Sequence, residues 1–562
     1  MKIRLGRLAL IAVMAAGVLT GCTGEPEYLD QNWTEENQLR DKFYTTSQGS
    51  QLIPYEWFFA LENAKSHKLI SSHDEISLLG YLPDYVPDPL TNPDGLPVGF
   101  VKDEDPQTGD WLGVNCAACH TAQFTYKQHV VRIDGAPSMG DFIKLYRTVR
   151  DSLDATLASR QKFRRFAKRL RLNYSESRAV YAQMKKIAAE LDGTIERGVS
   201  KDHEPGYGRV DAFSGIRNEV FQHDLGIKEN FRPSIAPVSY PFLWGTPDLQ
   251  AVQWTGNADN PFGRNAGQVL GVLGRLDLKN PATLFESSIR RDNVFLMEQW
   301  VRELKAPKWP AHILGRIDQA AAQRGRALYN KVDASGYSCA SCHALKNAKG
   351  QYPLTPASDN AFGKQFVKTT NIPLDEIGTD PNAFLTIYAQ GDFKTGGLAP
   401  LLGGETEMFG PTLLTQIGGG VVRKLFQASP ALTPQQQAVY SGFRVYAPGV
   451  EAPAYVPGYK ARPLEGIWAT SPYLHNGSVP TLHDLLLPPS ERPSIFWVGN
   501  YEFDPVSVGY VTDNSFIRYK GVQARMFRFD TTRAGNYNSG HEYGTHLSRS
   551  QRWDLVEFLK TL

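Results

Sequence analysis

"NCAACHTAQF", residues 115–124, contains the pattern Cys-x-x-Cys-His, and "SCASCHALKN", residues 338–347, contains it again. The two boxes supply six side chains in the same order: Cys116, Cys119, His120, Cys339, Cys342 and His343. With 5 Cys and 12 His in 562 residues, chance alone gives only ~10⁻³ such boxes. The boxes therefore mark a repeated site, and the rest of the chain is interpreted around them.

Each box has the form of a covalent attachment site for haem c. The two thiols add to the haem vinyl groups, and the adjacent His becomes the proximal iron ligand. The alternative is a structural zinc ion, which needs four ligands at one place. Zinc does not require a His directly after the second Cys. The sequence thus predicts two covalently bound haem c groups, with His120 and His343 as iron ligands.

The bulk composition is that of a soluble globular protein with several cores. The chain has 562 residues, a formal net charge of +2, and 41% hydrophobic residues. This charge is too balanced to favour nucleic acid as a partner. Fifty Gly and 36 Pro residues favour a loop-rich fold over long regular elements.

The N-terminus has the pattern of an export signal. A basic start is followed by an apolar run at residues 8–19, too short to span a bilayer. The run ends in "LTGC", which resembles the lipobox of bacterial lipoproteins, with Cys22 as the lipidated residue. An ordinary signal peptide with an incidental Cys is the alternative. We expect residues 1–21 to be a signal peptide and 22–50 a tether. The anchor would lie in the outer membrane, on the periplasmic or cell-surface side.

The predicted fold class is mainly α, with two cytochrome c-like haem domains, long loops, a helical insertion and little β. The N-terminal haem domain is expected at 51–310, with the insertion at 141–191, where apolar residues recur at helical spacing without Pro. The C-terminal cytochrome c domain is expected at 318–562. Amphipathic helices at 319–330 and 549–562 would open and close it.

Two further segments have distinctive compositions. Residues 160–172, "RQKFRRFAKRLRL", are strongly basic. They form either a docking face for an acidic partner or anionic lipid, or simply a solvated helix face. Residues 246–267 are rich in Gly, Asn and Pro, which predicts an ordered loop rather than an element.

The sixth iron ligands decide between electron transfer and catalysis. A haem with two protein ligands moves electrons, whereas an open one can bind oxygen or peroxide. Near the second box the candidates are Met408, His475, His483, His541 and His546. Any one of them can instead be an ordinary hydrogen-bonded loop residue.

Residues 459–486, "YKARPLEGIWATSPYLHNGSVPTLHDLL", resemble the C-terminal signature of the bacterial di-haem cytochrome c peroxidase and MauG superfamily. More narrowly, the chain resembles the haem-c rubber oxygenases and their relatives. The matching stretches span nearly the whole mature chain: "GVNCAACHT", "RIDGAPSMGDF", "GYGRVDAF", "QWTGNADNPFGRNAGQVLGV", "IPLDEIGTDP", "RPSIFWVGNYEFDPVSVGY" and "GHEYGTHL".

The resemblance implies roles for particular residues. The usual distal His and Met of the peroxidases fall on Ala136 and Pro489, so both peroxidase ligands are missing. In the rubber oxygenase group a C-terminal His closes the second haem, and "GHEYGT" makes this His541, with His546 as runner-up. In that group the first haem is left open to dioxygen, which in this chain would be the haem on His120.

The same resemblance places two more residues near the first haem. Trp254 and its loop would lie by the distal pocket, making it a catalytic candidate beside His120; a plain core Trp is the alternative. An aromatic residue that lies close to the bound oxygen in rubber oxygenases is replaced by Val269. This departure puts polyisoprene in doubt as the substrate, though not an open haem.

The favoured function is that of an exported di-haem oxygenase. Its partners would be dioxygen and an apolar small molecule or polymer such as polyisoprene, whose C=C bonds it cleaves. One alternative is a peroxidase that reduces hydrogen peroxide with electrons from a donor protein. Another is a non-enzymatic electron carrier, which would need His129 or Met139 to close the first haem. We do not expect nucleic acid as a partner, and we expect contact with the membrane only through the lipid anchor.

Overall fold

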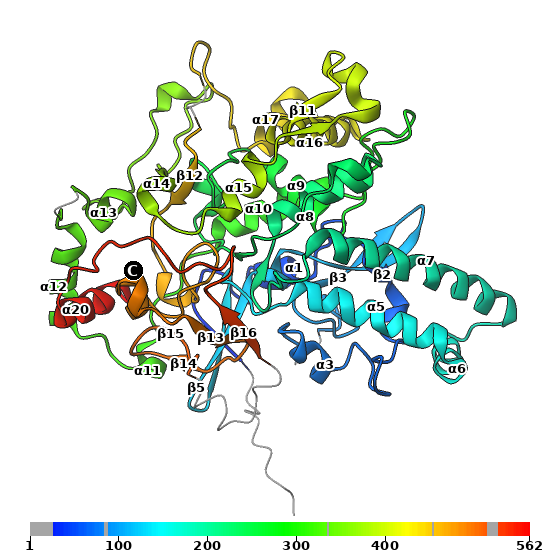
Figure 1. Cartoon of the computed structure of the whole chain (residues 1–562), viewed down its shortest axis with the longest axis horizontal. Coiled ribbons are helices and arrows are strands. Elements are labelled where there is room, and N and C mark those ends of the chain that lie inside the picture. The colour runs from blue at the N-terminus through cyan, green and yellow to red at the C-terminus, as the bar shows by residue number, and fades with distance from the viewer. Residues whose placement is uncertain (1–25, 84–87, 334–335, 452–454, 514–525) are drawn as a thin grey trace, which may run out of the picture.

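The computed structural model describes residues 26–83, 88–333, 336–451, 455–513 and 526–562 (Figure 1). The expected signal peptide and Cys22 lie outside these residues. Helices make up 39% of the chain and strands 15%, which agrees with a mainly α fold. Among the described residues, no helix has the length and apolar character needed to cross a membrane.

The first box lies between two small three-stranded sheets. One has the order β2-β4-β3, with β2 Ile53–Pro54, β4 Gly109–Val114 and β3 Phe100–Asp105. The other has the order β1-β6-β5, with β1 Glu27–Tyr28, β6 His129–Asp134 and β5 Thr121–Tyr126. The single turn α4 (Cys116–Cys119) connects β4 to β5, so the box is held at both ends by hydrogen-bonded strands.

The prediction that residues 22–50 form a tether is wrong for residues 26–50, which the structure describes. β1 pairs in parallel with β6, and the side chains of Trp33 and Phe43 are buried in the main core. Helix α1 (Leu39–Thr45) lies beside the first box. Buried aromatic residues give this segment a packing role that its polar composition hid.

Three helices occupy the segment expected to be a helical insertion. They are α5 Phe142–Ala158, α6 Arg160–Arg169 and α7 Tyr174–Gly198, and they extend away from the rest of the chain (Figure 1). Asp141 caps α5, and Asn173 forms a capping box with Glu176 at the start of α7. These helices bury their apolar faces in a core of their own with residues 52–118.

The second box is framed by two packed helices. α12 (Gln319–Asn330) and α20 (Arg549–Leu559) cross closely beside α13 (Cys339–Cys342). A methyl group on Gly325 would lie only 2.0 Å from the Asp554 carbonyl oxygen. Glycine therefore sets how closely these helices approach.

A further group of helices packs around α9. They include α8 Ala212–Asn218, the π-helical turn η1 Glu219–Asp224, α9 Pro261–Gly271, α10 Arg291–Glu303 and α16 Gly410–Gln427. The loop expected at 246–267 is wrong from residue 261 onward, where α9 begins: Asn260 caps this helix and Pro261 occupies its first turn, a helix start signal.

The other helices are α2 Tyr55–Phe58, α3 His73–Leu78, η2 Lys228–Asn230, η3 Thr246–Asp248, α11 Ala311–Leu314, η4 Ala357–Asp359, α14 Leu374–Ile377, α15 Asn382–Tyr388, η5 Gly396–Leu402, α17 Pro434–Tyr440, η6 Ile467–Ala469, α18 Leu482–Leu485 and η7 Pro489–Glu491. The other strands form two-stranded pairs: β7 Arg209–Val210 with β8 Val238–Ser239, β9 Thr370–Pro373 with β12 Gly458–Ala461, β10 Asp392–Lys394 with β11 Glu407–Phe409, β13 Ile495–Val498 with β16 Phe527–Asp530, and β14 Phe503–Asp504 with β15 Gly509–Tyr510.

The largest core combines both halves of the chain. It contains Phe124 from β5 together with Trp468 and Leu555 from the C-terminal half. Thr125 N also donates to the Tyr501 carbonyl at 2.6 Å. The expected domain boundaries thus do not separate the cores, and the two boxes are positioned by one shared framework.

Candidate functional site

The first box is fixed by local hydrogen bonds. The Asn115 side chain accepts from Ala117 N at 2.9 Å and donates to the Phe43 carbonyl at 2.7 Å. Gly99, at φ +75° in the turn before β3, lets the backbone pass so close that a methyl group would lie 2.0 Å from Ala118 N. Burial lowers the pKa of His120 to about 4, which keeps its imidazole neutral and able to ligate a metal.

The second box has an equivalent arrangement. Ser338 and Ser341 form a capping box around α13. His343 Nδ1 donates to the Arg462 carbonyl at 2.8 Å. Such a bond fixes the tautomer and leaves Nε2 free for iron. Burial also lowers the pKa of His343.

His541 lies opposite His343. Their ring centres are 6.3 Å apart, with the rings inclined by 45°. Two metal–nitrogen bonds of about 2 Å each, plus two half-rings, would add up to this separation if both side chains held one metal ion. Burial, with the nearby His343 and Arg492, lowers the pKa of His541 to about 3. The two neutral imidazoles would therefore suit the iron of a haem held at the second box.

One continuous cavity of about 960 Å³ joins both boxes. The four box cysteines carry no disulfide, and burial raises the pKa of the Cys116 thiol to about 11. Of the other proposed ligands, His541 and His475 line the cavity; Met408, His483, His546, His129 and Met139 are not among its lining residues. The lining also includes Met297, on α10, which the sequence did not single out.

Trp254 lines the same cavity as the two boxes. Its Nε1 donates to the Ser239 carbonyl, and its own carbonyl accepts from Lys460 N, each at 2.8 Å. Trp254 packs in an apolar cluster with Phe213 and with Cys342 of the second box. It therefore contacts the surroundings of the second box as well as the cavity.

Basic side chains flank both boxes inside the cavity. Arg264, on α9, pairs with Glu298 at 2.5 Å, and both act electrostatically on Cys116. Beside the second box, burial and the neighbouring Arg462 lower the pKa of Lys460 well below its ordinary value. A haem carries two propionate carboxylates, on the edge opposite the vinyl groups that the thiols take, so buried cations that line the cavity fit that group.

Glu219, His223 and Asp224 form the one cluster of metal-type side chains found among the described residues outside the boxes. His223 Nδ1 lies 3.0 Å from Glu219 and 3.1 Å from Asp224, while Arg197 pairs with Glu219 at 2.7 Å. The Asp224 and Glu219 carboxylates raise the pKa of His223 to about 9. The protonated imidazole and Arg197 thus balance the carboxylates without a metal.

Beyond the boxes, the cavity extends among helices α8, α9 and α16. Its walls there include Ile216, Leu414 and Ile417, and Val269 lies at its edge on α9. A methyl group added at Gly215 or Gly418 would meet nothing within 4 Å. This part of the cavity is an apolar chamber, defined here by Gly215, Ile216, Leu414, Ile417 and Gly418.

Comparisons with known proteins connect these residues to cytochromes. A family described as RoxA-like, cytochrome c-like matches residues 458–498, which include Lys460, Arg462 and His475. A relative named "Uncharacterized protein y4iJ" from Sinorhizobium fredii is 33% identical over 585 residues, covering 95% of this chain and 93% of the relative. A second, "Uncharacterized protein y4iM" from the same organism, is 28% identical over 383 residues, covering 65% and 74%. The cytochrome c-like match implies haem c and haem-dependent redox activity.

Proposed function

This chain belongs to the protein family of y4iJ and contains a RoxA-like cytochrome c segment, and we propose that it is an exported di-haem oxygenase. Its reaction would cleave C=C bonds of an apolar substrate. The observation that carries the proposal is the cavity itself. It joins both boxes and the His343–His541 pair to a chamber with apolar walls.

The two boxes have different surroundings, which supports different roles. His343 faces a second imidazole, whereas the ring contact of His120 is with Tyr240, at 6.0 Å between centres. Cys339, Cys342, His343 and His541 would hold a closed haem that stores or tunes redox charge. Cys116, Cys119 and His120 would hold an open haem, whose chemistry is the activation of dioxygen.

The residues of this chain provide the environment for that chemistry. The chamber walls orient an apolar chain and exclude water, and Trp254 forms part of the cavity wall. Both atoms of dioxygen end in the two carbonyl products, so the reaction needs no added reductant. Polyisoprene is the substrate we propose to test first, although Val269 departs from the aromatic residue of the rubber oxygenases.

Export and anchoring form part of the proposal. Haem c is attached outside the cytoplasm, so the boxes and the signal-like residues 1–21 support each other. Lipidation of Cys22 would place the protein on the outer membrane, on its periplasmic or outer side. Radiolabelled palmitate should enter the wild-type protein and not Cys22→Ser; equal labelling of both would contradict the anchor.

The deciding experiment has two parts, both on the purified full-length protein. The reduced protein should bind carbon monoxide at one haem per chain, because among the described residues the ring that contacts His120 is that of Tyr240 and not a second imidazole. Oxygen uptake should then accompany carbonyl products when a polyisoprene emulsion is added without reductant.

The outcomes separate the three functions. Binding of carbon monoxide without oxygen uptake, but with turnover of hydrogen peroxide and a donor protein, would favour the peroxidase. Absence of carbon monoxide binding would favour the electron carrier and make Met297 or His475 the closing ligand.

A further inference from the structure

Lys460 and Arg462 form a basic pair beside the second box. Lys460 N donates to the Trp254 carbonyl, and the Arg462 carbonyl accepts from His343 Nδ1, each at 2.8 Å. Lys460 belongs to β12, Arg462 directly follows that strand, and both side chains line the cavity. The backbone thus fixes two cations relative to the proximal His.

The Arg462 guanidinium is held rigidly but incompletely. Nη1 and Nη2 donate to the carbonyls of Phe242 and Trp244 at 3.0 and 2.7 Å, and the group lies 3.8 Å from the Phe242 ring centre. Its Nε is buried and has no hydrogen-bond partner. None of these neighbours carries a negative charge, so the positive charge of Arg462 is not neutralised by them.

The Lys460 ammonium is not neutralised by a partner in the described part of the chain. In the described part of the chain, Nζ makes neither a hydrogen bond nor an ion pair. Other shielded lysines are satisfied: Lys162 Nζ donates to two carbonyls at 2.7 and 2.8 Å, and Lys560 pairs with Glu557 at 2.5 Å. A shielded ammonium beside a guanidinium is costly unless an anion joins it.

We propose that Lys460 and Arg462 bind the propionate carboxylates of the haem c attached at Cys339 and Cys342. Two cations meet two carboxylates, and charge-assisted bonds of this kind are about twice as strong as neutral ones. The inference rests on the proposed haem at the second box. It does not depend on the reaction at the first box.

The test is a redox titration of the full-length haem-loaded protein. Loss of a positive charge favours the ferric state, so Lys460→Met should lower the reduction equilibrium constant of the second haem about tenfold, which is about 59 mV for one electron. Lys460→Arg should restore most of the shift. The control is Lys346→Met, because Lys346 belongs to the same half of the chain but is exposed and already paired with Glu465.

The outcomes distinguish this inference from the proposed function. An unchanged potential in Lys460→Met, with two haems per chain by pyridine haemochrome assay, overturns the propionate pairing. One haem per wild-type chain, with the second box free, overturns the proposed cofactor content instead.

If Lys460→Met fails to fold, a measurement on the wild-type protein still tests the pairing. Resonance Raman bands of propionate bending should have the frequencies of charge-paired carboxylates. Frequencies equal to those of the haem peptide in water would contradict the pairing.

Discussion

His541 adopts a backbone conformation that is unfavourable for its residue type. Its φ of 49° lies in the left-handed region, which costs a non-glycine residue about 1–2 kcal/mol. Its N–H donates to the Ile377 carbonyl at 2.8 Å, and Arg492 donates to the preceding carbonyl of Gly540 at 2.9 Å. The loop is therefore forced into a shape that directs the imidazole toward His343.

Replacement of His541 tests this geometry directly. In His541→Ala we expect the whole low-spin signal of one haem to disappear from the ferric electron paramagnetic resonance spectrum, because one axial nitrogen is lost. The other haem should be unaffected. His546→Ala is the control, because His546 is exposed in the same segment. If His546→Ala removes the low-spin signal and His541→Ala does not, His546 is the ligand instead.

Residue-level prediction from sequence worked where the chemistry is local. Each box keeps its thiols and imidazole on one turn, so the spacing alone predicts the group that they hold. His541 is far from His343 in sequence, and only a family resemblance pointed to it. Lys460 could not be singled out, because the sequence does not reveal that its ammonium lines a cavity with no ion-pair partner among the described residues.

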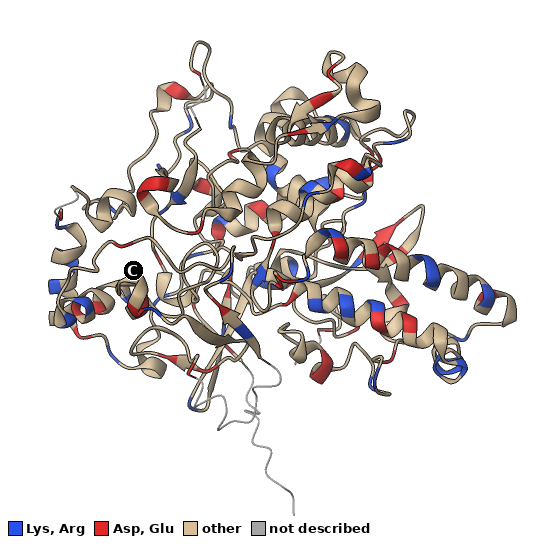
Figure 2. Cartoon of the chain, viewed as in Figure 1, with Lys and Arg blue, Asp and Glu red and all other residues tan. Residues whose placement is uncertain are grey.

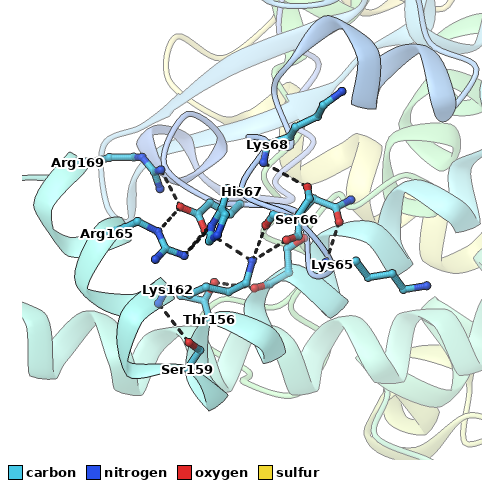
Figure 3. Close-up of polar contacts among 12 residues, drawn as sticks. Lys65, Ser66, His67, Lys68, Thr156, Ser159, Lys162, Arg165 and Arg169 are labelled. Carbon is cyan, nitrogen blue, oxygen red and sulfur yellow. Dashed lines mark hydrogen bonds and ion pairs between the residues drawn. The ribbon is translucent and has the colours of Figure 1, made fainter.

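Helix α6 shows how a basic segment can be structural. Figure 2 shows Lys and Arg gathered on α6, and Figure 3 shows three of them turned inward. Arg165 and Arg169 each lie 2.7 Å from the carboxylate of Glu62, and Lys162 lies 3.6 Å from it. Glu62 is only 2% exposed, so this face of α6 is an internal contact rather than a docking surface.

Glu62→Gln should loosen α6 at neutral pH. The hydrogen bonds from Arg165, followed by those from Arg169 and His67, hold the pKa of Glu62 well below its ordinary value of 4.5. A lowered carboxyl pKa stabilises the fold above pH 4.5, and the effect is lost as the pH falls below that value. We expect amide exchange in α6 to reveal a loss of about 2 kcal/mol, less than for a fully buried pair because both arginines reach solvent.

The pH dependence is the control for that experiment. The difference between wild type and Glu62→Gln should shrink as the pH falls below 4.5, because protonation removes the wild-type advantage. A difference that stays constant down to pH 3 would show that shape, not charge, holds α6. Lys68→Gln is the control, because Lys68 pairs with Asp74 at the exposed surface. This substitution should leave amide exchange in α6 unchanged.

Two glycine-to-alanine changes in helices should have opposite signs. Gly325→Ala places a methyl group 2.0 Å from the Asp554 carbonyl oxygen, and we expect a loss of about 2 kcal/mol as α12 and α20 separate. Gly418→Ala meets nothing within 4 Å and should gain up to about 1 kcal/mol from helix propensity. Thermal unfolding midpoints that shift in the same direction would contradict the α12–α20 crossing.

At the level of elements, periodicity indicated the helices at 141–191 and at both ends of the second region, but not α10 and α16 or the short strands. The helical spacing at 141–191 and the amphipathic segments near both ends of the second region correspond to α5–α7, α12 and α20. β3 to β6 are only six residues each and mix polar with apolar positions. α9 begins in Gly- and Asn-rich sequence, so composition favoured a loop although its Asn-Pro start indicated a helix.

The whole molecule is organised around a shared interior rather than around two separate domains. β5 from the first half packs on β14 from the second, and α9 packs on α16. Sequence patterns describe neighbours along the chain, so they predicted two units, each with its own box. Contacts between segments hundreds of residues apart create the cavity, and no local pattern encodes them.

The apolar chamber makes a prediction about size selection. Three successive glycines, 418–420, lie inside α16, where each costs about 1 kcal/mol relative to Ala. Gly420 packs so closely against Phe285 that a methyl group would lie 2.6 Å away, but Gly418 lines the cavity with open space at its Cβ position. Packing explains Gly420, whereas the space at Gly418 is available to a ligand.

Gly418→Phe should fill this space without unfolding α16, because Phe is a better helix former than Gly. We expect carbon monoxide binding to the reduced protein to stay within twofold of wild type. The affinity for 4-phenylimidazole should fall at least tenfold, and oxygen uptake with polyisoprene should fall with it. Gly397→Phe is the matched control, since Gly397 also has open space but does not line the cavity. Equal loss of the small and the bulky ligand would mean that the chamber governs access to the iron in general; no loss of either would mean that apolar substrates enter from another side.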